Sequence, residues 1–157
     1  MNKSHLTAIS RKAPSAPMKW LVSKFKANGI GPILDYGAGK GQDVKYLNNC
    51  GFTAIGYDPH YAPNTIQNGL ANHFHVITSM FVLNVIESSL ERDSTILHIK
   101  SLLMPKGHAY VAIRADKDKL KGYTRKGTFQ TYVDMIPYGF KLLHKGSGYE
   151  LYEYIKP

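Results

Sequence analysis

A glycine-rich turn between an apolar pair and a helix-like stretch constrains the fold more than any other part of this sequence. Ile33-Leu34 leads into residues 35–41 (DYGAGKG), and residues 42–47 continue with the apolar spacing of a helix. Glycines are needed where a backbone turns tightly and a ligand approaches it closely, and a helix N-terminus offers free N–H groups. A strand, a glycine loop and a helix in this order predict half of a nucleotide-binding α/β unit.

The spacing of the glycines narrows the choice of ligand. A dinucleotide-binding loop, G-x-G-x-x-G, would need glycine where the chain has Gln42, and the Gly-Lys-Ser/Thr of a P-loop is absent. The pattern Asp-x-Gly-x-Gly-x-Gly resembles motif I of class I S-adenosylmethionine-dependent methyltransferases. In that family the leading acid faces the cationic amino acid end of the cofactor, and the resemblance gives this role to Asp35.

A second acid stands where the same resemblance requires one. Residues 53–57 (TAIGY) have an apolar strand pattern that ends in Asp58, seventeen residues after Gly41. In the family this acid binds the ribose hydroxyls. The resemblance therefore implies S-adenosylmethionine as the cofactor, bound by Asp35, Tyr36, Gly37, Ala38, Gly39, Asp58, Pro59, Ser79 and Met80.

The chain is short after this second acid. Only sixteen residues, 59–74, separate Asp58 from the apolar strand that begins near His75, and they are rich in proline, asparagine and glycine. A βαβ unit takes about 30 residues. We therefore expect the loss of a helix and of the edge strand that usually carries the adenine-recognising residue in this family, so that loop residues hold the adenine.

The next apolar stretch, Val76–Glu87, predicts a buried strand that runs into a turn and a short helix. In methyltransferases the carboxyl end of this strand faces the methyl group. Amino-group methylation of bases typically uses Asp/Asn/Ser-Pro-Pro-aromatic there, but Ser79-Met80-Phe81 lacks both prolines, and the Pro-Cys nucleophile of cytosine C5 methylation is also absent. Our catalytic candidates are Ser79, Asn84 and Arg114, with Tyr36, Glu87, Thr128 and Gln130 as further residues around the methyl group.

Several different short motifs are spread along the chain. They are Thr7-Ala8-Ile9, Arg11, Ser15, Pro17, Asp35-Tyr36-Gly37, Asp43-Val44, Asp58-Pro59, Phe81–Glu87 and Arg125–Gln130. Together they resemble a narrower group, the methyltransferases associated with DNA phosphorothioation. The resemblance spans roughly residues 7 to 135. It implies the same fold and cofactor and points to DNA modification, although the members of that family are longer than this chain.

Positive charge is concentrated in two parts of the chain. Twenty basic residues against eleven acidic ones give a net charge of +9. A field of this sign attracts phosphate polymers, which favours nucleic acid or a nucleotide as the substrate over a merely solvated surface. One cluster comprises Lys3, Arg11, Lys12, Lys19, Lys24 and Lys26, and the other comprises Lys117, Lys119, Lys121, Arg125 and Lys126.

Length and cysteine usage predict one cytoplasmic domain, residues 1–157, with a basic N-terminal segment, residues 1–16. A chain of 157 residues can bury one sizeable core. Cys50 stands alone, which excludes a disulfide framework and suits a reducing compartment, and we expect it to be a small buried residue. The N-terminus lacks the apolar core of a signal peptide, and no run approaches the ~20 apolar residues of a membrane span.

Capping signals place two helices. Ser15 is expected to cap a helix opened by Pro17, and Ser88 with Glu91 forms a capping box before a helix that ends near Pro105. His73 and His75 would share one side of a strand, but no further ligand stands at a supporting spacing, so we expect no metal site.

The remaining segments complete a predicted α/β fold. Residues 108–114 have the pattern of a core strand, residues 115–130 that of a lid or substrate loop, and residues 130–136 that of a short helix. Residues 140–144 and 149–155 predict an antiparallel hairpin. The expected architecture is a Rossmann-like class I methyltransferase fold, with a mostly parallel sheet, helices on both faces and an antiparallel C-terminal hairpin.

Three functions of different classes remain open. The first is S-adenosylmethionine-dependent transfer of a methyl group to nucleic acid or a nucleotide by in-line displacement, in which the protein aligns the reactants and excludes water. The second is a non-catalytic module that binds S-adenosylmethionine, nucleic acid or a protein partner, and it would show salt-sensitive binding without turnover. The third is methylation of a small molecule or a protein, with a positive surface that plays no part in recognition.

Overall fold

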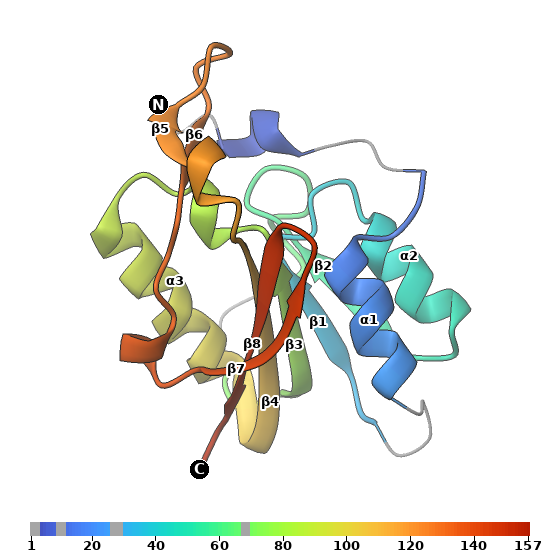
Figure 1. The fold of residues 1–157 in the computed structure, drawn as a ribbon. Coiled ribbons are helices and arrows are strands. Elements are labelled where there is room, and N and C mark those ends of the chain that lie inside the picture. The colour runs from blue at the N-terminus through green and yellow to red at the C-terminus, as the bar shows by residue number, and fades with distance from the viewer. Residues whose placement is uncertain (1–3, 9–11, 26–29, 67–69) are drawn as a thin grey trace.

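A twisted sheet divides the molecule into two sides (Figure 1). The computed structural model describes residues 4–8, 12–25, 30–66 and 70–157; Lys3, Ile9, Arg11 and Lys26 of the motifs and clusters above lie outside them. Within the described residues the main sheet has the strand order β2-β1-β3-β4-β8-β7. Its strands are β1 (Ile33–Tyr36), β2 (Ala54–Tyr57), β3 (Phe74–Met80), β4 (Leu103–Arg114), β7 (Lys141–Gly146) and β8 (Tyr149–Ile155).

The strand directions confirm the predicted topology. Strand β1 pairs in parallel with both β2 and β3, and β3 pairs in parallel with β4. Strands β8 and β7 then add antiparallel to the edge of β4. Because the chain leaves β1 for β2 on one side and reaches β3 on the other, the carboxyl ends of β1 and β3 flank a topological switch point. Open α/β sheets bind their ligands at such points.

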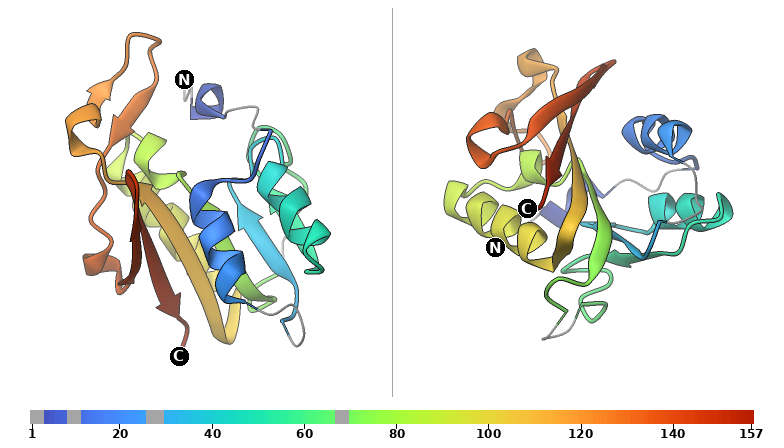
Figure 2. Two further views of the ribbon diagram at one scale, coloured as in Figure 1. Left: turned by 45° about the vertical axis from the view of Figure 1, so that its right-hand side comes forward. Right: turned by 90° about the horizontal axis from the view of Figure 1, so that it is seen from below.

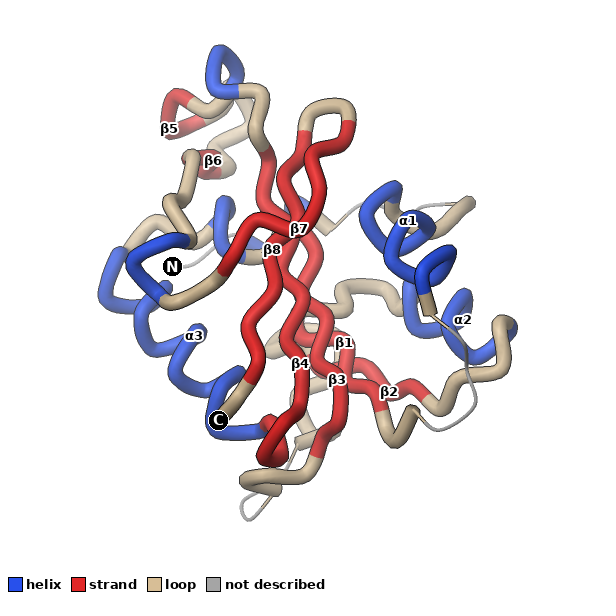
Figure 3. The backbone as a smooth tube through the Cα atoms, turned by 60° about the horizontal axis from the view of Figure 1, so that its bottom comes forward, coloured by secondary structure: helices blue, strands red, loops and turns tan. Residues whose placement is uncertain are grey.

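Helices cover both faces of the sheet, as predicted (Figure 2). Helices α1 (Ala16–Lys24) and α2 (Gln42–Asn49) pack on one face, and Met18, Leu21 and Leu47 are buried there. Helix α3 (Ser89–Leu102) packs on the other face through Ile96 and Ile99. The backbone tube shows the strands passing between α3 and the pair α1 and α2 (Figure 3). Two apolar clusters, one on each face, therefore hold the layers together.

Both predicted N-cap residues are confirmed. The Ser15 hydroxyl accepts a hydrogen bond from the N–H of Met18 at the start of α1, and the Ser88 hydroxyl accepts one from the N–H of Glu91 at 3.2 Å. Helix α3 ends at Leu102, three residues before the expected Pro105, and the strand after it begins at Leu103 and not at residue 108. The pairing with β3 is interrupted by a bulge between these two positions, and this irregularity contains Pro105 and Gly107.

The segment after β2 lacks the elements of a full βαβ unit. Among its described residues, 58–66 and 70–73, there is no helix or strand, only an isolated bridge between Asp58 and Ala62. Strand β2 therefore lies at the edge of the sheet. The sixteen-residue spacing predicted this reduced architecture.

Residues 115–135 differ from the prediction. The expected loop folds into a short turn, η3 (Lys117–Lys119), and a separate hairpin of β5 (Lys121–Tyr123) and β6 (Phe129–Thr131). The helix predicted at residues 130–136 is wrong. Val133 and Met135 are buried and Asp134 between them is exposed, which is the two-residue period of extended chain. A turn, η4 (Ile136–Tyr138), follows.

The burial predicted for Cys50 is also wrong. Cys50 is exposed directly after α2, because the chain turns at Gly51 (φ +91°) and brings Phe52 into the core in its place. No helix in the described part of the chain is long and apolar enough to cross a membrane.

Candidate functional site

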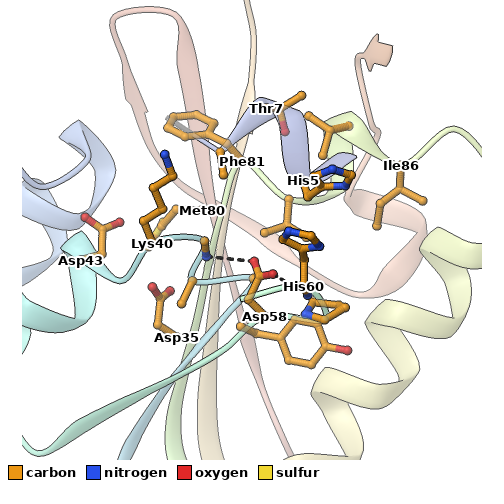
Figure 4. Close-up of a pocket in the computed structure, with 18 of the residues that line it drawn as sticks. His5, Thr7, Asp35, Lys40, Asp43, Asp58, His60, Met80, Phe81 and Ile86 are labelled. Carbon is orange, nitrogen blue, oxygen red and sulfur yellow. Dashed lines mark hydrogen bonds between the residues drawn. The ribbon is translucent and has the colours of Figure 1, made fainter. Parts of the chain in front are cut away.

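A cavity of about 380 Å³ lies at the carboxyl ends of β1, β2 and β3. This volume is within the range of ~300–1,000 Å³ that small-molecule sites occupy. In the close-up, Lys40 and Asp43 lie toward one end, His60 and Ile86 toward the other, and Asp58 between them (Figure 4). The segments that line it are the loop after β1, the start of α2, the turn after β2, the loop after β3, the start of α3, and the N-terminal turn η1 (Ser4–Thr7).

The glycine loop is fixed between two neighbouring segments. The N–H groups of Gly37 and Ala38 both donate to the carbonyl oxygen of Tyr57, at 2.7 and 2.9 Å, which ties the loop to the end of β2. Gly37 has φ +80°, and a Cβ atom there would lie 2.3 Å from Cγ2 of Val82 in the loop after β3. Only glycine adopts this positive φ without strain and has no Cβ to collide with Val82. The loop can therefore lie close to the strand ends and line the cavity with backbone.

Asp35 is the last-but-one residue of β1 and only 3% exposed. The Thr78 hydroxyl, on the paired strand β3, donates to Oδ1 of Asp35 at 2.9 Å. A buried carboxylate held by a hydroxyl is fixed in position, and this one lines the cavity. It can attract a cationic group there.

Asp58 joins the glycine loop to the turn after β2. Its Oδ2 accepts the N–H of Gly39 at 2.9 Å, and its Oδ1 accepts the N–H groups of His60 and Tyr61 at 2.9 and 3.1 Å. A carboxylate has about four lone-pair sites, so capacity remains for a further donor such as a ligand hydroxyl. Asp58 thus shapes the wall of the cavity and also offers it an acceptor.

The match to a protein-family model decides the identity of this chain. Residues 10–138 match the model described as a methyltransferase domain. The chain belongs to this methyltransferase family. Comparison with curated proteins gives no match.

Solved structures support the same fold. The 1,6-didemethyltoxoflavin-N1-methyltransferase of Burkholderia thailandensis, with 1,6-didemethyltoxoflavin and S-adenosylhomocysteine bound, aligns with a TM-score of 0.64 and 15% identity over 90% of this chain and 78% of its own. An S-adenosylmethionine-dependent methyltransferase of Mesorhizobium loti aligns with a TM-score of 0.62 and 13% identity over 90% of this chain and 98% of its own. A chain from the complex between the Haloferax volcanii Trm112 methyltransferase activator and a methyltransferase aligns with a TM-score of 0.63 and 13% identity over 88% of this chain and 87% of its own.

In this methyltransferase the cavity gathers most residues predicted to bind the cofactor. Ser79 is the exception, because its side chain is fully buried and its hydroxyl has no partner among the described residues. Those that line the cavity are Asp35, Tyr36, Gly37, Ala38, Gly39, Asp58, Pro59 and Met80.

The three catalytic candidates do not line the cavity. Besides Ser79, these are Asn84, whose Nδ2 donates to Oε1 of Gln130 at 2.7 Å, and Arg114, which pairs with Asp116. The hydrogen bond from Arg114 lowers the pKa of Asp116. Asn84 and Arg114 thus make contacts within the protein, and Asn84 connects the loop after β3 to the β5–β6 hairpin.

The further candidates are also engaged. The Tyr36 hydroxyl makes a 2.7 Å hydrogen bond with Nδ1 of His98 on α3; burial raises the pKa of Tyr36 and lowers that of His98. The Tyr123 hydroxyl donates to the Glu87 carboxylate, which raises the pKa of Tyr123. Glu87 therefore joins Asn84 in connecting the hairpin to the loop after β3.

Sequence reasoning missed a contact that anchors α1 beside the cavity. The N–H and the hydroxyl of Ser15 donate to Oδ1 and Oδ2 of Asp43, each at 2.7 Å, and Asp43 lines the cavity from the first turn of α2. Both residues belong to the motifs of the narrower resemblance. The resemblance therefore marked both Ser15 and Asp43, but it gave no indication that the two residues are in contact.

The N-terminal turn was missed entirely as part of the wall. His5 of η1 stacks on His60 with ring centroids 4.2 Å apart and planes at 16°, and both line the cavity (Figure 4). Phe81 was missed as well; it has φ +63°, a strained angle of the kind that clusters at functional sites. Metal ligands do not gather here: the described residues contain no group of three or more His, Cys, Asp or Glu that could hold an ion.

Proposed function

We propose that this methyltransferase transfers a methyl group from S-adenosylmethionine to nucleic acid or a nucleotide. Its own residues fit the cofactor. Asp35 offers a buried carboxylate to the amino acid end, Gly37 lets the backbone approach closely, and Asp58 offers an acceptor to the ribose hydroxyls. The similar B. thailandensis enzyme contains S-adenosylhomocysteine, which supports the same cofactor class here.

The chemistry needs alignment more than it needs a strong base. When bound, S-adenosylmethionine supplies a methyl group on a sulfonium, which an acceptor can take by in-line displacement. The chain contributes a fixed glycine loop and an apolar wall of Met80, Phe81 and Val82 that excludes water. These residues orient and shield the reacting groups. We give the buried Ser79 no role in binding the acceptor.

The β5–β6 hairpin is the observation that supports a nucleic acid or nucleotide acceptor. It is bonded to the loop after β3 through the Gln130–Asn84 and Tyr123–Glu87 contacts, so it stands beside the cavity. Figures 1 and 2 show it at the same end of the molecule as η1. Lys121, Arg125 and Lys126 are exposed on it, and Tyr123 is 64% exposed. Basic groups that attract phosphates and a ring that can stack on a base are a common combination in nucleic-acid binding.

Transfer of radiolabelled methyl from S-adenosylmethionine tests this proposal. The acceptors are single- and double-stranded DNA, with DNA first because of the phosphorothioation resemblance, then RNA and mononucleotides. Arg125→Glu/Lys126→Glu should raise KM for the polymer and lower the slope of log affinity against log salt by about 1 to 2. Lys141→Glu/Lys145→Glu on β7 makes the same charge change on another strand and is the matched control. No label in any of these acceptors, with the cofactor bound, would overturn the proposal.

A second candidate is methylation of a small molecule. It is favoured by the B. thailandensis structure, which contains 1,6-didemethyltoxoflavin. In this case the radiolabelled methyl group would enter a small heterocycle. Both double variants would then transfer it with the same KM as the unchanged protein. The H. volcanii complex with a methyltransferase activator also supports a protein partner, which co-purification with tagged protein would reveal as a stoichiometric second chain.

A further inference from the structure

We propose that the adenine of the cofactor is bound by two segments that stand in for the missing helix and edge strand. These are the turn that carries His60 and the first turns of α3 that carry Glu91 and Thr95, with His5 of η1 closing the end of the site. The inference rests on the proposed S-adenosylmethionine cofactor and deepens it by assigning residues to the base.

The two acids set the direction in which the base must lie. With the amino acid end at Asp35 and the ribose at Asp58, the base extends from Asp58 away from Asp35. In Figure 4 the cavity continues on that side toward His60 and Ile86. The ribbon of α3 lies on that side in the same view, and the cavity-lining residues on α3 or next to His60 and Ile86 in the chain are Pro59, Val85, Glu91 and Thr95. They come from the turn after β2, the loop after β3 and α3, and none of the described residues at 62–66 and 70–73 lines the cavity.

The His5–His60 pair provides a flat surface at this end. The N–H of His60 is held by Asp58 at 2.9 Å, so the residue follows directly from the ribose-binding acid. The two imidazole rings stack at 4.2 Å, and the Tyr61 hydroxyl donates to the carbonyl oxygen of His5 at 3.5 Å. Planar heterocycles gain binding energy against such rings. The side chains of Pro59 and Ile86 give the rest of this end an apolar lining.

Glu91 provides an acceptor for the exocyclic amine. Its backbone is held on both sides: the N–H donates to the Ser88 hydroxyl at 3.2 Å, and the carbonyl oxygen accepts from the Thr95 hydroxyl at 2.9 Å. The backbone of Glu91, which lines the cavity, is therefore fixed in the first turn of α3. The adenine 6-amino group is a donor that a carboxylate accepts, whereas the 6-oxo group of hypoxanthine is an acceptor that a carboxylate repels.

Calorimetry with two ligands that differ at the N1–C6 edge of the purine tests the role of Glu91, because adenine has a 6-amino group and an unprotonated N1 where hypoxanthine has a 6-oxo group and an N1–H. The two ligands are S-adenosylhomocysteine and S-inosylhomocysteine. The unchanged protein should bind the amino compound about tenfold or more tightly, as expected for a hydrogen bond to a charged group. In Glu91→Gln the side-chain amide can serve either purine, so the preference should fall to about twofold or less. Asp93→Asn makes the same charge change on the same helix, where Asp93 accepts from Tyr138, and should keep the full preference.

The histidine pair is tested with adenosine, which lacks the amino acid end. His60→Ala and His5→Ala should each weaken adenosine binding about threefold to thirtyfold, while Leu6→Ala, an exposed neighbour in η1 that does not line the cavity, should leave it unchanged. If the unchanged protein binds no S-adenosylhomocysteine, the proposed function itself fails. If it binds that ligand and Glu91→Gln keeps the tenfold preference, or the histidine variants bind adenosine normally, only this inference is overturned.

Discussion

Single polar side chains in this protein do two tasks at once. Asp58 accepts three backbone N–H groups, from Gly39, His60 and Tyr61, and thereby fixes both the glycine loop and the turn after β2. The same carboxylate lines the cavity. A turn residue and a ligand-binding residue therefore coincide, and the position cannot be varied for one task without affecting the other.

Asp58→Ala should weaken binding of S-adenosylhomocysteine by about 1–3 kcal/mol, because a hydrogen-bonded acid is lost and three N–H groups lose their acceptor. Asp58→Asn keeps one acceptor oxygen for the turn and should lose less. Calorimetry measures both, with Asp118→Ala, an exposed acid of η3, as the control. Equal affinity for the alanine variant and the unchanged protein would exclude Asp58 from the site.

His98 should make stability depend on pH in a defined direction. Burial lowers its folded pKa, so between that value and the ordinary ~6.5 the unfolded chain binds more protons than the folded one. Its contribution is present above pH ~6.5 and is lost as the pH falls through the folded pKa. In urea unfolding between pH 5 and 8, the stability of the unchanged protein relative to His98→Gln should therefore fall with decreasing pH. A difference that stays constant would contradict this.

At the scale of elements, α1 is attached to the site through its N-terminus. Ser15 caps α1 and also bonds to Asp43 of α2, so that the two helices on this face are joined beside the cavity. The cap was predictable because its signal spans a few neighbouring residues. The pairing with Asp43 was not, because it joins positions 28 residues apart and nothing in either side chain specifies the other.

Ser15→Ala should destabilise the protein by about 2–4 kcal/mol, the sum of a lost cap and a lost buried hydrogen bond to a charged acceptor. Ser88→Ala removes an exposed cap from α3 and should cost only about 0.5–2 kcal/mol, which makes it the matched comparison. Both values come from urea unfolding. If the two substitutions lower the free energy of unfolding by the same amount, the Ser15–Asp43 contact makes no net contribution to stability.

Elements were predicted best where the signal is local and repetitive. The glycine loop, the two caps and the C-terminal hairpin follow from spacing over a few residues, and the structure has them. The helix expected at residues 130–136 failed because a short apolar pattern was assigned the wrong period: the buried Val133 and Met135 alternate with the exposed Asp134 and Ile136. The hairpin before it is set by contacts with the loop after β3, which no local pattern encodes.

At the scale of the whole molecule, the short segment after β2 moves part of the site onto other segments. With β2 at the edge of the sheet, the cavity is completed by η1 at the start of the chain and by α3. The sequence predicted the loss but not the replacement, because His5 and His60 meet only through the tertiary fold. The acids predicted to hold the cofactor, Asp35 and Asp58, both lie on the cavity wall. Of the catalytic candidates, Ser79 is buried on β3, while Asn84 and Arg114 are held by Gln130 and Asp116.

Ligand-linked stability tests the whole arrangement in one measurement. A ligand that binds only the folded state at 100 times its Kd adds about 2.7 kcal/mol, which for a domain of this size corresponds to a rise in Tm of about 5–11 °C. S-adenosylhomocysteine should produce this shift. NAD should not, because Gln42 stands where a dinucleotide-binding loop requires glycine. Differential scanning calorimetry with both ligands at the same concentration decides the matter, and an equal or larger shift with NAD would mean that the glycine loop between β1 and α2 binds a dinucleotide.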